Sequence, residues 1–255
     1  MELISEKDWQ TYINAFREIN DTASRKMVEY LEKYEQDETG TLVDLLDYAH
    51  GISTKYGEAS SELACILYDQ LAVAAGLEIE PAIPAAPATF DEVASAVRGT
   101  MPTGNVEIVA AAVGRLAKMA GADTMIENAK RDGAQLAWVP HGMTCAYCIA
   151  LGASGWRYAD AEGISRGNHA AHIHSNCDCM YAVRFSPLDG IGGYKPEEYA
   201  KMYYGTGEST AKGRINALRR EIYAENSEEI NEQKRSAYEK RQERESSAAE
   251  EMDIE

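Results

Sequence analysis

Five residues between positions 145 and 179 have the types and the spacing of a metal site. Two intervening residues separate Cys145 from Cys148 and also His174 from Cys177, and Cys179 follows two positions later. Thiolates and imidazole nitrogens are the usual ligands of structural zinc, and a two-residue gap lets both ligands reach one tetrahedral ion. The sequence therefore predicts one structural zinc ion per chain.

Two sets of four ligands fit this spacing. In the first set, His174 joins Cys145, Cys148 and Cys177, and Cys179 is a buried neighbour. In the second set the four clustered cysteines, including Cys179, bind the ion, and His174 donates a hydrogen bond to one of them instead of binding the metal. Spacing does not separate the two sets, so the fourth ligand stays open between His174 and Cys179.

The same region allows an alternative reading as a metal-dependent nuclease or another zinc enzyme. His169 and His172 crowd together with Asn168 just before His174. No pair of acidic residues accompanies them to hold a catalytic ion. No glycine-rich phosphate loop and no nucleophilic serine elbow is present either. We therefore expect no enzymatic activity and keep the nuclease as the alternative.

Composition and charge narrow the class of protein further. The chain has 255 residues and a net charge of −17, and its Lys and Arg residues are interleaved with Glu. Broad binding to nucleic acid favours the opposite balance, so at most a limited contact with DNA is expected. No apolar run approaches the roughly 18 residues of a membrane span, and the acidic start does not resemble a secretory signal. Clustered cysteines in such a chain favour metal binding over disulfides, whereas Cys65 is expected to be a buried apolar residue.

Most of the chain has the periodicity of amphipathic helices. Apolar residues recur at steps of three and four, and Thr41 with Asp44 is typical of a helix cap. Pro81, Pro84 and Pro87 predict an extended connector. Helices are expected at residues 5–35, 42–71, 91–98 and 106–129, and short strands at 136–140, 156–158 and 180–185.

These patterns predict a mainly α fold in which long amphipathic helices flank a small zinc-stapled α+β module of short strands. The strands carry few apolar groups, so we expect the metal to supply folding free energy that a local core lacks. The expected organisation is an N-terminal helical region (1–78), a Pro-rich linker (79–90), a helical region (91–135), the metal-binding module (136–190) and a C-terminal helix with a charged tail (191–255).

Several stretches resemble the MuF-like minor capsid proteins of tailed bacteriophages, a family of phage head morphogenesis. The cysteine-rich stretch from Cys145 to Tyr158, continued by 161–163 and by His174 to Cys179, is similar to the cysteine-rich segment of that family. Residues 55–71 and Trp138 fit the family's preceding helix and aromatic position. The resemblance spans about residues 40 to 205.

The resemblance implies a structural protein of the virion that acts in head morphogenesis. It implies several copies per particle, contacts with the portal and major capsid proteins, and a place in the capsid interior or at the portal vertex after assembly in the host bacterial cytoplasm. A part in DNA packaging or ejection is compatible with it. The family pattern falls on the five metal-site residues, and it brings no catalytic residue with it.

Overall fold

In the computed structural model the described residues are 1–34, 40–141, 144–159, 179–228, 231–232, 235–236, 238–239 and 242. The elements are, in chain order, β1 (Glu2–Ile4), α1 (Glu6–Tyr34), α2 (Leu42–Ala74), α3 (Phe90–Thr100), the 3-10 turn η1 (Met101–Thr103), α4 (Val106–Arg131), β2 (Gln135–Val139), α5 (Ala146–Gly152), β3 (Arg157–Tyr158), β4 (Met180–Arg184), β5 (Gly190–Ile191), α6 (Pro196–Gly205) and α7 (Ala211–Glu225).

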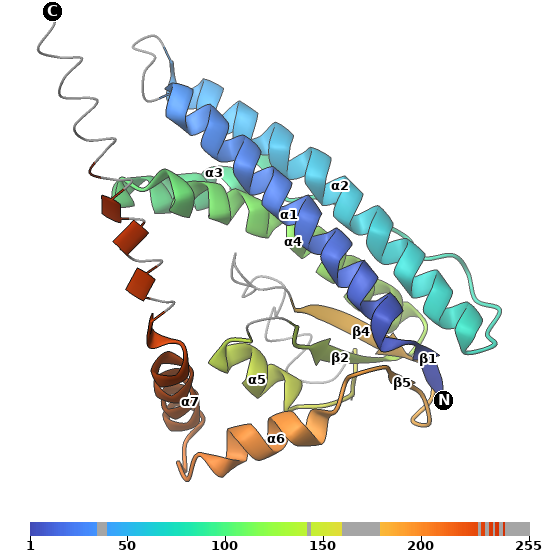
Figure 1. Cartoon of the computed structure of the whole chain (residues 1–255). Coiled ribbons are helices and arrows are strands. Elements are labelled where there is room, and N and C mark those ends of the chain that lie inside the picture. The colour runs from blue at the N-terminus through green and yellow to red at the C-terminus, as the bar shows by residue number, and fades with distance from the viewer. Residues whose placement is uncertain are drawn as a thin grey trace, which may run out of the picture.

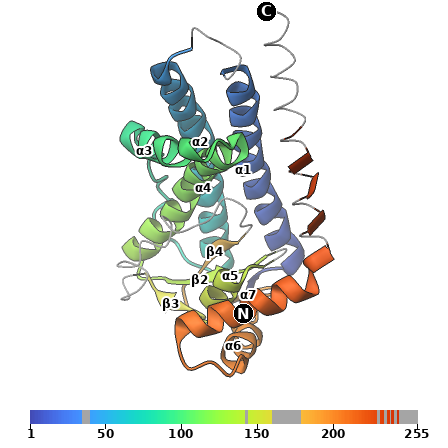
Figure 2. The same ribbon diagram turned by 90° about the vertical axis from the view of Figure 1, so that its left-hand side faces the viewer.

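Three long helices, α1, α2 and α4, pack against one another as a layer, with the sheet and the shorter α5, α6 and α7 on one side of it (Figures 1 and 2). The predicted helices are confirmed, each within a few residues of its expected bounds. The expected cap is also confirmed. The Asp44 N–H donates to Thr41 Oγ1 at 3.3 Å, and the Thr41 N–H donates to an Asp44 carboxylate oxygen at 3.0 Å.

Two glycines let α4 approach both partner helices closely. A Cβ atom on Gly114 would lie 2.1 Å from Ser24 Oγ of α1, and one on Gly121 would lie 2.4 Å from Ser60 Oγ of α2. Real Cβ atoms are not found this close to other heavy atoms, so glycine is what permits these contacts. Helix α4 therefore lies in the groove between α1 and α2.

Residues 77–89, here called the strap, connect α2 to α3 without forming a helix or strand. Their backbone is hydrogen-bonded to both long helices on either side. The Ala85 N–H donates to Thr124 Oγ1 at 3.0 Å, and Ser61 Oγ donates to the Ala85 carbonyl at 2.9 Å. Asn128 accepts the Ile83 N–H at 2.9 Å and donates to the Ile83 carbonyl at 2.8 Å. The strap is thus bonded between α2 and α4 rather than hanging free.

The larger sheet has three antiparallel strands in the order β3-β2-β4. Strands β2 and β4 are buried along almost their whole length, and their apolar residues belong to the same core cluster as residues of α1, α2 and α4. The expectation that few apolar groups hold the strand around Tyr181 is wrong, whereas both residues of β3, the strand that follows Trp156, are exposed. The helical layer covers the sheet, so burial of apolar surface already stabilises it.

The sequence did not predict a second, two-stranded sheet, in which β1 runs parallel to β5. A Cβ atom on Gly192 would lie 2.3 Å from the Glu6 backbone nitrogen, and Gly193 has a φ of +77°, which favours glycine. The expected C-terminal helix is instead two helices, α6 and α7. Mainly helical architecture with a few short strands is confirmed, and none of the helices described is long and apolar enough to cross a membrane.

Candidate metal segment and surface pocket

The end of the β2–β4 pair brings two parts of the predicted metal site into one region. Val139, the last residue of β2, pairs with Met180, the first residue of β4. Cys179 directly precedes β4, and the chain leaving β2 reaches Cys145 at the start of α5. The sheet register therefore places Cys179 beside the end of β2, the strand from which the chain leads to Cys145 and Cys148.

The Cys145-to-Cys148 turn has a defined local geometry. Cys145 is the N-cap of α5, with φ −75° and ψ 159°, and its Sγ accepts the Cys148 N–H at 3.4 Å. An N-cap acceptor satisfies one of the amide groups that a helix start leaves without a partner. The same type of N–H···S bond also stabilises a thiolate, so the turn fits a zinc-binding cysteine pair.

The sulfur atoms lie in a protected environment. Cys148 and Cys179 are each 1 % exposed and belong to the main core cluster, and Cys145 is partly buried against it. The pKa of Tyr147, between the two helix cysteines, is raised first by burial and then by Cys148 and Cys145. Burial and then Cys179 raise the pKa of Tyr199 on α6.

Contacts on both sides hold α5 in place. A Cβ atom on Gly152 would lie 2.7 Å from Pro140 Cγ and 3.3 Å from Tyr199 Cγ, so the C-terminal turn of α5 is wedged between them. The Tyr194 hydroxyl donates to the Gly152 carbonyl at 2.9 Å. These contacts fix the helix that carries Cys145 and Cys148.

The other predicted ligands, His174 and Cys177, lie outside the described residues, as do His169 and His172 of the alternative nuclease site. Within the described part of the chain, no three His, Cys, Asp or Glu side chains form a group that could hold a metal ion. The zinc site and its fourth ligand therefore stay predictions.

The sequence did not predict a contact between α1 and the residues that lead from β2 to Cys145. Gln10 Nε2 of α1 lies 2.7 Å from Nε2 of His141, four positions before Cys145. No local pattern in the sequence connects His141 to Gln10. Cys65 also differs from expectation. It is only partly buried on α2, where burial, Asp69 and Glu62 raise its pKa.

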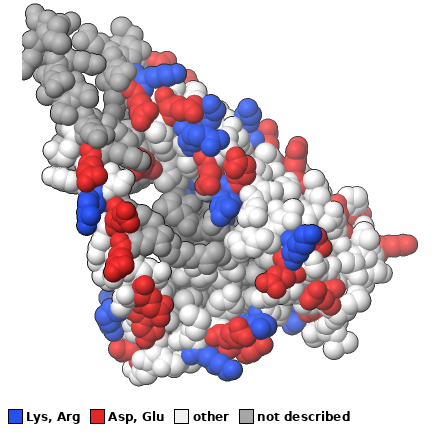
Figure 3. All heavy atoms as spheres, in the orientation of Figure 1, with Lys and Arg blue, Asp and Glu red and all other residues white. Residues whose placement is uncertain are grey.

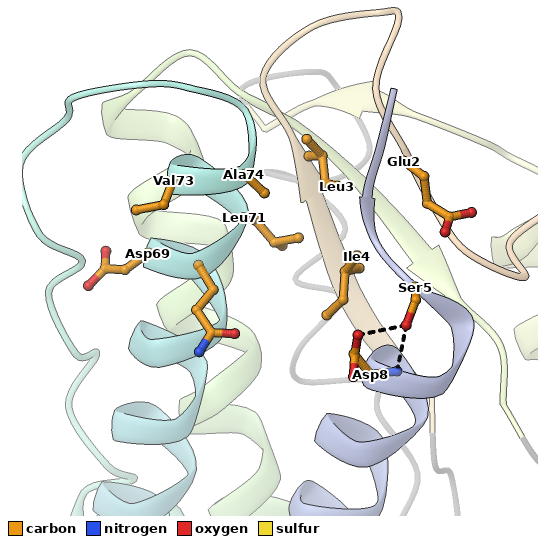
Figure 4. A pocket seen from close by; sticks show the side chains of 10 residues that line it. Glu2, Leu3, Ile4, Ser5, Asp8, Asp69, Leu71, Val73 and Ala74 are labelled. Carbon is orange, nitrogen blue, oxygen red and sulfur yellow. Dashed lines mark hydrogen bonds between the residues drawn. The ribbon is translucent and has the colours of Figure 1, made fainter.

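A surface pocket of about 510 Å³ lies between β1 and the C-terminal end of α2 (Figure 4). The residues that line it are Glu2, Leu3, Ile4, Ser5, Asp8, Asp69, Gln70, Leu71, Val73 and Ala74. They combine an apolar surface with three carboxylates, and none of them is Lys, Arg or His. The hydroxyl of Tyr12 donates to Gln70, which links α1 to α2 beside the pocket.

Charges of both signs are interspersed on the face drawn in Figure 3, where Lys and Arg lie beside Asp and Glu. One carboxyl group is perturbed by the fold. Burial, followed by the nearby Glu127 and Glu92, raises the pKa of Asp123 on α4 to about 6. Asp123 is partly buried and carries a destabilising charge at neutral pH.

Comparison with known proteins gives one family. The model of the family described as VG15 protein matches residues 3–206, from β1 to just past α6, and so includes the cysteine segment and the pocket. No curated protein and no solved structure matches the chain.

Proposed function

We propose that this chain, which belongs to the VG15 protein family, is a structural minor capsid protein of a tailed phage that acts in head morphogenesis. VG15 is a family of viral proteins, and the match over residues 3–206 is the observation that carries the proposal. The resemblance of the cysteine-rich segment to MuF-like minor capsid proteins supports the finer assignment to the phage head. The proposed role includes no catalytic activity.

The proposed location is the capsid interior or the portal vertex, with several copies contacting the portal and major capsid proteins. Three closely packed long helices give the chain an extended, well-supported surface for such contacts (Figure 1). A net charge of −17 disfavours extensive contact with packaged DNA and suits binding to basic protein surfaces. Any role in DNA packaging or ejection would then act through protein contacts.

The head assignment is tested on purified particles. Full heads and empty heads are separated and analysed by quantitative mass spectrometry. Head assembly is also compared between the intact phage and a phage whose gene for this chain is deleted. We expect a fixed ratio of the chain to the portal protein in mature heads, and fewer or defective heads without it. Absence of the chain from heads at every stage, with normal head assembly when it is missing, would overturn the assignment.

We also propose one structural zinc ion per chain, bound by Cys145, Cys148, Cys177 and either His174 or Cys179. The N–H···S bond of Cys148 to Cys145 supports this donor set, and so does the position of Cys179 directly before β4, whose first residue pairs with the last residue of β2. A bound zinc ion would supply a cross-link between α5 and the segment that enters β4. Because the sheet is already buried, the ion would mainly hold this segment in place rather than supply the core.

Elemental analysis of the purified chain tests the zinc proposal. We expect about one zinc per chain, lost in Cys148→Ser and retained in the matched variant Cys65→Ser, whose cysteine lies on α2. The variants His174→Ala and Cys179→Ser identify the fourth ligand, since only the true ligand is needed for full occupancy. A wild-type chain that holds no zinc after purification without chelator contradicts the proposal.

A further inference from the structure

Burial along the strap repeats every third residue. Its inward positions are buried or half-buried, and all of them are small or aliphatic: Ile79, Ala82, Ala85 and Ala88. The remaining residues from 77 to 89 are exposed, except for Pro87, which lies against Gly57 of α2. A period of three is that of the polyproline II helix, whereas an α-helix or a strand would repeat differently. The strap therefore has one inward face and two outward faces.

The sequence and the neighbouring helices both favour this conformation. Prolines recur at every third position, 81, 84 and 87, and each holds the residue before it in an extended conformation. Polyproline II has no internal hydrogen bonds, so its backbone groups need other partners. Asp69 accepts the Ala82 N–H at 2.8 Å, and Figure 4 shows Asp69 on the side of α2 along which the strap runs. Arg131 of α4 donates to the Glu80 carbonyl at 2.8 Å and to the Pro81 carbonyl at 2.9 Å.

The outward faces of the strap present proline and isoleucine side chains. Pro81 and Pro84 are exposed, and Ile83 is 61 % exposed although its backbone N–H and carbonyl are both bonded to Asn128. Residues 80–81 and 83–84 are thus two outward pairs that each end in proline, with the inward Ala82 between them. Segments of the form PxxP bind in grooves lined by aromatic side chains. One buried face leaves the other two available to such a groove.

The ends of the strap differ in charge. Glu78 and Glu80 are exposed near its start, and residues 77–89 include no Lys, Arg or His. A groove that receives this end is complementary if Lys or Arg lies beside it. The helical layer already holds the strap in place, so docking would cost less conformational entropy than the ordering of a free proline-rich segment.

We propose that the outward faces of the strap dock into an aromatic-lined groove of a partner protein, with basic side chains beside that groove. Ile83 and Pro84 contact the aromatic side chains, and Glu80 pairs with a Lys or Arg of the partner. The inference goes beyond the proposed function and rests on the geometry of the strap.

An SH3 domain, whose aromatic groove binds PxxP segments, is the probe. A form with lysines at the rim of the groove is labelled with nitrogen-15 and titrated with the full chain, and NMR shift changes are measured. We expect these changes at the groove residues. Ile83→Lys should weaken binding about tenfold or more, because it places a charge in the apolar contact next to the rim lysines. The matched variant Ile108→Lys, at a 44 % exposed isoleucine in the first turn of α4, should bind like the wild type.

A second form of the SH3 domain, with glutamates at the rim, tests the charge. We expect it to bind about tenfold more weakly than the lysine form, and Glu80→Gln should weaken binding to the lysine form. Absence of binding to both forms, equal binding of both forms, or equal binding of Ile83→Lys and Ile108→Lys overturns the proposal. Sedimentation velocity of the chain alone adds one more outcome: self-association that Ile83→Lys abolishes would make a second copy the occupant and would also overturn it. Circular dichroism shows whether each variant is folded.

Discussion

Replacing Gly121 by Ala tests whether α4 depends on close contact with its neighbours. The added Cβ would lie 2.4 Å from Ser60 Oγ, 3.0 Å from the Ser60 carbonyl oxygen and 3.2 Å from Phe16 Cε1. Ser60 is 1 % exposed and Phe16 is 4 % exposed, so neither neighbour has solvent to move into. Overpacking of this kind costs about 3 kcal/mol, and the better helix propensity of alanine returns about 1 kcal/mol. The net expectation is a free energy of unfolding lowered by about 2 kcal/mol.

Gly51→Ala is the matched control, because Gly51 lies inside α2 and a Cβ atom there meets nothing within 4 Å. Only the propensity term acts at this position, so the free energy of unfolding should rise by about 1 kcal/mol. Urea denaturation followed by far-UV circular dichroism measures both variants, with the midpoint compared at an unchanged slope. If Gly121→Ala raises the midpoint as Gly51→Ala does, α4 does not pack as described.

Three further substitutions test other parts of the fold. Asn128→Ala should lower the free energy of unfolding by about 1–3 kcal/mol in urea, because the buried Asn128 amide makes two hydrogen bonds to the Ile83 backbone and both are lost. Asp123→Asn should stabilise the chain at pH 7 by at most about 3 kcal/mol and hardly at pH 4. The pKa of Asp123 in the folded chain, about 6, lies above the ordinary 3.8, so the wild type loses stability as the pH rises from about 4 to about 6. Melting curves of both proteins over this pH range measure the difference. Tyr68→Phe removes a 2.7 Å hydrogen bond from the Tyr68 hydroxyl to Asp132. We expect the melting temperature to fall by a few degrees, equivalent to about 1–2 kcal/mol. An unchanged melting temperature would show that this bond contributes nothing to stability.

The helices could be predicted because their signals are local. The apolar stripe of α1 and the Thr41–Asp44 cap each depend on residues three or four positions apart. The packing of the strap could not be predicted in this way. Its hydrogen-bond partners Thr124 and Asn128 lie some forty positions further along the chain. The alanine and proline residues of the strap form no pattern that indicates these partners.

The same distinction between local and long-range contacts applies to the candidate metal site. The turn from Cys145 to Cys148 is visible in the sequence because its hydrogen bond closes within four residues. The burial of β2 and β4 depends on helices that cover them, and the contact of Gln10 with His141 joins distant elements. Strands as short as β1 and β5 have no periodicity to detect.

The pairing of β1 with β5 has a consequence for the order of folding. Among the described residues the strand partner of β1 is β5, at residues 190–191, whereas α1, α2 and α4 are synthesised and can pack together well before it. The pocket between β1 and α2 is therefore completed only after the helical layer has formed, and a chain shortened before residue 190 would have the packed long helices without it.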